Sequence, residues 1–117
     1  MNPTPILAGL LVVAFAAAGS AKLAAVPAMR AKAAHVGFSV SAYRRIGLLE
    51  ILAVLGLLVG AFIPLIGALA AAGLLMLLGG AVVTHLRNGD GVREIAPALA
   101  LGLVTLAYLA LMVGSLR

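Results

Sequence analysis

The sequence predicts an all-α integral membrane protein, a four-helix bundle with very little of the chain outside the bilayer. Of its 117 residues, 65% are hydrophobic and only 9% are charged, whereas a soluble domain is about half apolar and about a quarter charged. Four apolar segments each reach about 20 residues, the length of a helix that crosses the lipid hydrocarbon. None of them alternates as β-barrel strands do. Residues 1–117 are therefore predicted to form a single transmembrane domain.

Residues that break helices separate the four predicted spans. Pro27 follows the first span, Pro64 separates the second from the third, and a turn is predicted at Asn88-Gly89-Asp90-Gly91 after the third. No Lys or Arg precedes the first apolar stretch, so we expect a retained helix rather than a signal peptide. The predicted spans are Ile6–Ala24, Tyr43–Phe62, Leu65–Leu86 and Ile95–Leu116.

The stretch between Pro27 and Phe38 has the pattern of a short amphipathic helix. Met29, Ala33 and Val36 recur at helical spacing. Its polar side comprises Arg30, Lys32 and His35. We expect this helix to lie along the cytoplasmic interface; a disordered loop is the alternative.

The basic residues predict the orientation of the chain. Of eight Lys and Arg residues, seven flank the first and third connections, and only Arg117 lies at the other side. By the positive-inside rule these connections are cytoplasmic and both termini face outward, in a multi-pass cell-membrane protein. Because the cations lie beside apolar spans and not in one stripe, nucleic-acid binding is not predicted. The seven are Lys22, Arg30, Lys32, Arg44, Arg45, Arg87 and Arg93.

A few polar residues lie inside the predicted spans. A charge there costs about 2.5–3.5 kcal/mol on insertion scales, so it usually faces the bundle interior and has a partner. With spans one and three running inward and span two outward, five such residues share the inner half of the membrane. This agreement in depth predicts a ligand-binding site formed by Ser20, Lys22, Glu50, Thr84 and His85.

Glu50 is predicted to lie at a helix–helix contact. Gly47 and Ala53 are on its face of the helix, and small residues let a neighbouring helix come close. Lys22, His85 and Arg45 are the predicted partners of its carboxylate. Gly73, Gly80 and Thr84 suggest a comparable narrow face on the third span.

Simpler explanations exist for each of these residues. Glu50 could only hold helices together, Lys22 could extend its amine to the interface, and His85 could be an interfacial histidine. No metal site is predicted, because one carboxylate and one imidazole are too few ligands. The sequence has no cysteine, which excludes disulfides and thiolate metal sites.

Several motifs of the chain, in this order, resemble those of the DoxX-like family of small bacterial membrane proteins. They are Gly19-Ser20-Ala21-Lys22-Leu23 in the first span, Gly47-Leu48-Leu49-Glu50 in the second, and Thr84-His85-Leu86-Arg87-Asn88-Gly89-Asp90 after the third. The resemblance covers nearly the whole chain and implies a four-helix membrane bundle. It also implies a link to redox systems, since the family is related to the membrane subunit of a thiosulfate:quinone oxidoreductase. No reaction is implied, because most members have no established activity.

Three functions are compatible with the sequence. The first is a membrane subunit of a redox-linked system, which binds a quinone or another lipophilic ligand in a polar pocket of the cytoplasmic half. His85, Lys22 and Glu50 would supply hydrogen bonds and protons, and a cytoplasmic or membrane partner would supply electrons. The second is a non-enzymatic assembly or scaffold subunit. The third is a small transporter, disfavoured because the first span lacks the glutamate of small four-helix exporters. Catalytic activity, the identity of a cofactor and homo-oligomerisation are left open.

Overall fold

A computed structural model describes residues 2–117, which form five helices and no strand. The helices are α1 (Thr4–Leu23), α2 (Pro27–His35), α3 (Val40–Val59), α4 (Pro64–Arg87) and α5 (Val92–Gly114). The four long helices correspond to the four predicted spans, which confirms the all-α prediction. The stretch between the first two spans is helical as predicted, and the loop alternative is wrong for Pro27–His35.

Local capping explains where these helices begin. The α3 helix begins three residues before the predicted span because Ser39 Oγ accepts a hydrogen bond from the Ala42 N–H at 3.0 Å. The α5 helix also begins early, because Glu94 Oε2 accepts a bond from the Gly91 N–H at 3.0 Å. Proline is the first residue of both α2 and α4, a position that needs no N–H donor.

Three helices, α1, α4 and α5, are long and apolar enough to cross a membrane by length and composition. The α3 helix has the same 20-residue length as α1 but carries Arg44, Arg45 and Glu50. Both arginines lie in its first two turns, and the apolar remainder packs against α1 and α4. The protein is thus an integral membrane four-helix bundle with one additional short helix.

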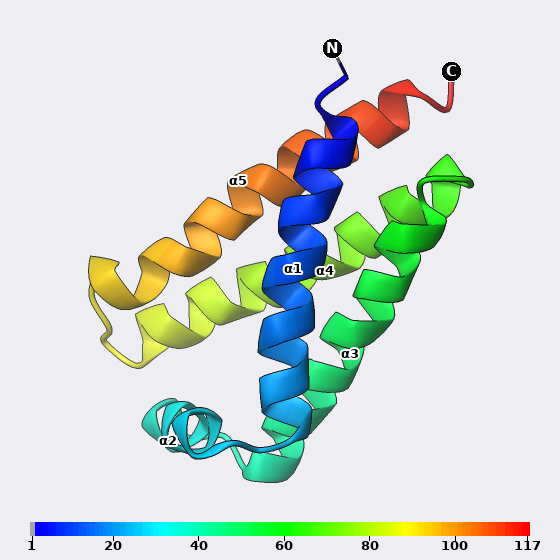
Figure 1. Ribbon diagram of the computed structural model, residues 1–117. Coiled ribbons are helices and arrows are strands. Elements are labelled where there is room, and N and C mark those ends of the chain that lie inside the picture. The colour runs from blue at the N-terminus through cyan, green and yellow to red at the C-terminus, as the bar shows by residue number, and fades with distance from the viewer. Residues whose placement is uncertain (1) are drawn as a thin grey trace.

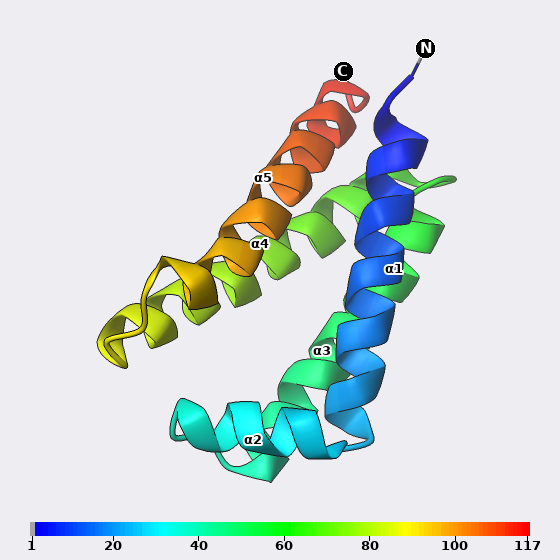
Figure 2. The ribbon, with the colours of Figure 1, turned by 60° about the vertical axis from the view of Figure 1, so that its left-hand side comes forward.

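The long helices form two pairs, α1 with α3 and α4 with α5 (Figure 1). Figures 1 and 2 show both chain termini at one end of the molecule, together with the α3–α4 turn. The α2 helix and the α4–α5 connection lie at the opposite end, called here the α2 end. The two pairs diverge towards the α2 end, so α2 lies across the wider part of the bundle (Figure 2).

The hydrophobic core lies between the two pairs. Its fully buried members include Leu11 of α1, Leu57 of α3, Leu74 of α4 and Tyr108 of α5. Small residues bring the pairs together near the terminal end: a Cβ at Gly60 would lie 2.6 Å from the Gly67 Cα and 2.8 Å from the Tyr108 hydroxyl. We call Gly60, Gly67 and Tyr108 the terminal-end contact, and it is where the two pairs approach most closely.

Candidate functional site

A close crossing of α1 and α3 positions the candidate site. A Cβ at Gly47 would lie 2.8 Å from the Gly19 carbonyl oxygen and 2.7 Å from the Lys22 Cβ. A side chain at Gly47 therefore requires a shift of α1 or α3, and one at Gly19 would be tightly packed, with its Cβ 3.0 Å from the Gly47 carbonyl oxygen. The small residue predicted beside Glu50 does create a helix contact, and the crossing brings the Lys22 side chain alongside α3.

Lys22 and Glu50 form a buried ion pair at this crossing. Lys22 Nζ lies 2.8 Å from Glu50 Oε1, and the two side chains are 13% and 6% exposed. Lys22 was one of three predicted partners of Glu50, and it is the residue that pairs with it. This separation is a hydrogen-bond distance, and no second donor among residues 2–117 bonds Oε1. Glu50 thus has one cationic partner and unused acceptor capacity.

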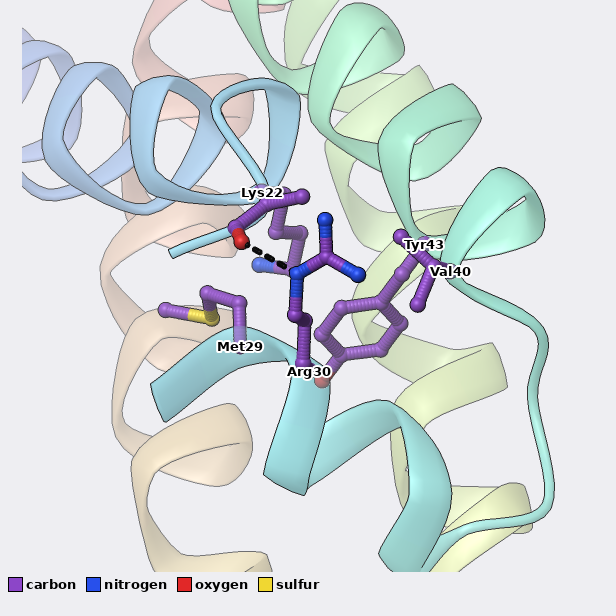
Figure 3. A pocket seen from close by; sticks show the side chains of 6 residues that line it. Lys22, Met29, Arg30, Val40 and Tyr43 are labelled. Carbon is purple, nitrogen blue, oxygen red and sulfur yellow. Dashed lines mark hydrogen bonds between the residues drawn. The ribbon is translucent and has the colours of Figure 1, made fainter. Parts of the chain in front are cut away.

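Tyr43 and Arg30 complete a shallow cleft beside this pair. Lys22 Nζ lies 5.4 Å from the centre of the Tyr43 ring, within the range of a cation–π contact. Arg30 of α2 donates from Nε to the Ala25 carbonyl oxygen at 2.8 Å, and its terminal nitrogens extend into the cleft (Figure 3). The cleft has no room for a water-sized molecule, and it is lined by Lys22, Ala25, Met29, Arg30, Val40 and Tyr43.

A second polar cluster lies at the α2 end but joins other elements. His35 Nε2 of α2 lies 2.9 Å from Asp90 Oδ1, and His85 Nδ1 of α4 lies 2.6 Å from Asp90 Oδ2. The Asn88 amide donates a further bond to Oδ1 at 3.1 Å. These bonds, led by that from His85, hold the pKa of the Asp90 carboxyl below its usual range. We call His35, His85, Asn88 and Asp90 the histidine cluster.

The chain matches the DoxX-like family over residues 6–113. The match covers nearly the whole chain and both polar clusters. This protein belongs to the DoxX-like family. Comparisons with curated proteins and with solved structures found no match. The family resemblance inferred from the sequence motifs is thereby confirmed.

In this DoxX-like protein the five predicted site residues do not all come together. Lys22 and Glu50 meet, whereas His85 bonds Asp90. Ser20 is exposed, and the Thr84 hydroxyl donates to the carbonyl oxygen of Gly80 at 2.7 Å within its own helix. Depth in the membrane was predicted from the spans, but the divergence of the two helix pairs separates residues of equal depth.

The predicted narrow face on α4 is wrong. A Cβ added at Gly73 or Gly80 would meet no other atom within 4 Å, so no helix approaches closely there. The close approach on α4 is at Gly67, near the terminal end. Glycines on one face of a helix therefore do not show that a neighbouring helix packs against that face.

Sequence reasoning also missed several residues of the two clusters. The sequence places Arg30 on the polar side of an interfacial helix and Tyr43 at the start of a span, and it predicts no site role for either residue. Asp90 is part of a motif that resembles the family, but the sequence predicts only a turn at this position. Its role as a hydrogen-bond acceptor for two histidines was not predicted. Among residues 2–117 no three His, Asp or Glu side chains are placed to hold a metal ion together.

An apolar groove runs along α3 and α4 on the side away from the Lys22–Glu50 pair. Its volume is about 660 Å³, within the range of about 300–1,000 Å³ that is typical of ligand pockets. Leu49 and Ala53, which flank Glu50 along α3, both line it. On α4 it is lined by Ile66, Leu69, Ala70, Gly73, Met76 and Leu77.

Proposed function

We propose that this DoxX-like protein is a membrane subunit of a redox-linked system, and that it binds the polar head group of a lipophilic ligand at the Lys22–Glu50 pair. A quinone is the leading candidate. The observation that carries the proposal is this buried pair, whose carboxylate has a single cationic partner. Buried ionisable residues in membrane helices are expensive, and they commonly mark ligand or proton sites.

The chemistry of the cleft suits a head group with carbonyl oxygens. Lys22 and Arg30 carry only donors, so each could bond a carbonyl oxygen. Glu50 could accept a proton or a hydroxyl hydrogen bond from a reduced head group. Electrons would come from a partner subunit, because the chain itself contains no cysteine and no motif for a redox cofactor.

One observation favours a second function, that of a scaffold subunit. The Lys22–Glu50 pair lies at the close Gly19–Gly47 crossing, so its attraction also holds α1 against α3. In that case the pair would contribute to folding alone, and the protein would act by binding other membrane subunits.

Ligand extraction followed by mass spectrometry separates the two functions. The protein is purified in mild detergent as wild type, as Glu50→Gln and as the double variant Lys22→Met/Glu50→Gln. Because the double variant leaves neither charge unpaired, we expect it to recover the stability that the single variant loses. If the pair binds ligand, co-purifying quinone is lost from both variants. Glu94→Gln, which removes only the hydrogen bond to the Gly91 N–H, is the control and should retain it.

A stable double variant that still co-purifies with quinone would refute a role of the pair in binding. Absence of quinone and of any other lipophilic compound from the wild type would favour the scaffold function.

We also propose that the α2 end faces the cytoplasm and that both termini face outward. The seven cations of the first and third connections support this orientation, as does their location at one end of the bundle. Single cysteines at Lys32, Asn88 and Asn2 test it with an impermeant thiol reagent on intact cells. Only the Asn2→Cys variant should be labelled; labelling of the other two alone would reverse the orientation.

A further inference from the structure

The α2 helix is attached to the bundle differently from the other helices. It has nine residues, and among the long helices it packs mainly against α3. Left-handed residues bracket it, Ala25 with φ 51° and Gly37 with φ 78°. Such a conformation is unusual for alanine, so the backbone changes direction sharply at both ends of α2. These two residues are natural hinges.

A four-residue connection joins the far end of α2 to α3, and side chains attach this end to the α4–α5 pair. His35, the last residue of α2, reaches Asp90 in the α4–α5 connection, 55 residues away in sequence. His85 at the end of α4 holds the other carboxylate oxygen. A carboxylate is an acceptor only, so both ring nitrogens that face Asp90 carry hydrogens. The Asp90 carboxylate thereby connects α2 to the α4–α5 pair.

The same helix covers the cleft. Met29 and Arg30 of α2 line one side of it, and Lys22 and Tyr43 line the other (Figure 3). With α2 in place the cleft has no room for even a water-sized molecule, whereas ligand pockets typically enclose about 300–1,000 Å³. A head group can therefore reach Lys22 only if α2 moves.

We propose that α2 is a gate over the Lys22–Glu50 cleft, hinged at Ala25 and Gly37, and that the histidine cluster is its latch. The function of the gate rests on the proposed ligand site, whereas the latch can be tested without a ligand. Asp90 holds α2 closed through His35, and His85 and Asn88 orient its carboxylate. Release of His35 detaches α2 from the α4–α5 pair, so that α2 can turn about its two hinges and expose the cleft.

The groups around Asp90 determine the strength of the latch. The groups that face it are His35 from α2, His85 from α4 and Asn88 from the turn. No Lys or Arg among residues 2–117 forms an ion pair with it. A charged carboxylate accepts stronger hydrogen bonds than a neutral amide oxygen does. Replacement of the Asp90 carboxylate by an amide should therefore weaken the latch.

Thiol labelling of the cysteine-free chain tests the latch directly. Met29→Cys places a single thiol in the cleft, and its labelling rate with a small maleimide is measured in nanodiscs. Adding Asp90→Asn, which cannot accept charge-assisted bonds, should raise the rate at least fivefold. Glu94→Gln is the matched control, because Glu94 is the other carboxylate of this connection and caps only Gly91. It should leave the rate unchanged.

Equal rates in the parent, Asp90→Asn and Glu94→Gln proteins, each with unchanged circular dichroism, would overturn the latch.

Locking α2 tests the gate. In the variant His35→Cys/Asp90→Cys a cleavable bifunctional thiol reagent replaces the latch with a covalent link. Binding of a short-chain quinone should be lost on cross-linking and recovered on cleavage, and equal binding in both states would refute the gate. If the wild type binds no quinone, the proposed function fails, while the labelling rates still decide whether the latch exists.

Discussion

The two polar clusters of the α2 end differ in how they meet the cost of burial. Lys22 and Glu50 lie between helices, where each has essentially one partner, and the close Gly19–Gly47 crossing sets their separation. In the histidine cluster one carboxylate accepts from three donors, and His35 is 54% exposed. The first cluster is held by helix packing, whereas the second itself holds two segments together. Loss of one member should therefore have a large effect in the first cluster and a local effect in the second.

The largest expected effect is that of Glu50→Gln. The substitution keeps the shape of the side chain but leaves the Lys22 ammonium buried without a counter-charge. Breaking a buried pair costs about 3–5 kcal/mol, and we expect a loss of this size in the free energy of unfolding, measured by denaturation in mixed micelles. Lys22→Met on this background should recover most of it. A single variant as stable as wild type would show that water reaches the pair.

The next effect tests whether packing sets the first cluster. Gly47→Ala should lower stability by about 1–3 kcal/mol, the usual cost of overpacking, since its Cβ would lie 2.7 Å from the Lys22 Cβ. Gly80→Ala is the control and should cost nothing, because its Cβ meets open space. Similar losses in both, measured by thermal unfolding in detergent, would contradict the close crossing.

A smaller effect is expected at Tyr43, whose ring contacts both Lys22 and, edge to face at 6.3 Å between centroids, Phe38. Tyr43→Leu should lower stability by about 0.5–1 kcal/mol through loss of the cation–π contact. Tyr43→Phe keeps the ring and should be close to wild type. If both variants lose equally, the hydroxyl group and not the ring face is the important feature.

The smallest effect on global stability is expected at Asp90, and it should depend on pH. The pKa of Asp90 is lowered in the folded protein, so its contribution is fully present above the ordinary value for aspartate, about 3.9. It is lost as the pH falls through the folded value. Thermal midpoints measured between pH 7 and pH 3 should therefore fall less steeply for Asp90→Asn than for wild type. Parallel curves would show that Asp90 carries no linked stability.

The sequence predicted the first cluster better than the second for a physical reason. Glu50 and Lys22 lie in or next to apolar spans, where an unpaired charge is so costly that a partner must exist. Asp90 lies in a polar turn, where an unpaired carboxylate costs little free energy. The sequence therefore gives no reason to expect a partner for it. The separation of His85 from the Lys22–Glu50 pair has another cause. The spans determine depth along the membrane normal, but not which helices are neighbours, and α4 diverges from α1 and α3 at the α2 end.

The same distinction applies to the fold. The length of the apolar segments was enough to predict four long helices. The first residues of α3 and α5, however, depend on the capping side chains of Ser39 and Glu94, which a hydropathy profile does not reveal. The Gly73 and Gly80 pattern failed because glycine permits close approach without requiring it. Gly47 was predicted correctly because a buried charge lies on the same face three residues later.

The terminal-end contact of Gly60, Gly67 and Tyr108 gives the bundle the geometry of a lever. From Gly67 to the end of α4 at Arg87 the helix is about 30 Å long at 1.5 Å per residue. A rotation of about 5° at this fulcrum would displace the far end of α4 by about 2.6 Å over that length. That displacement is comparable to a hydrogen-bond length, and it would separate His85 and Asp90 from His35. A tilt of α4 about the terminal-end contact would therefore have its largest effect at the histidine cluster.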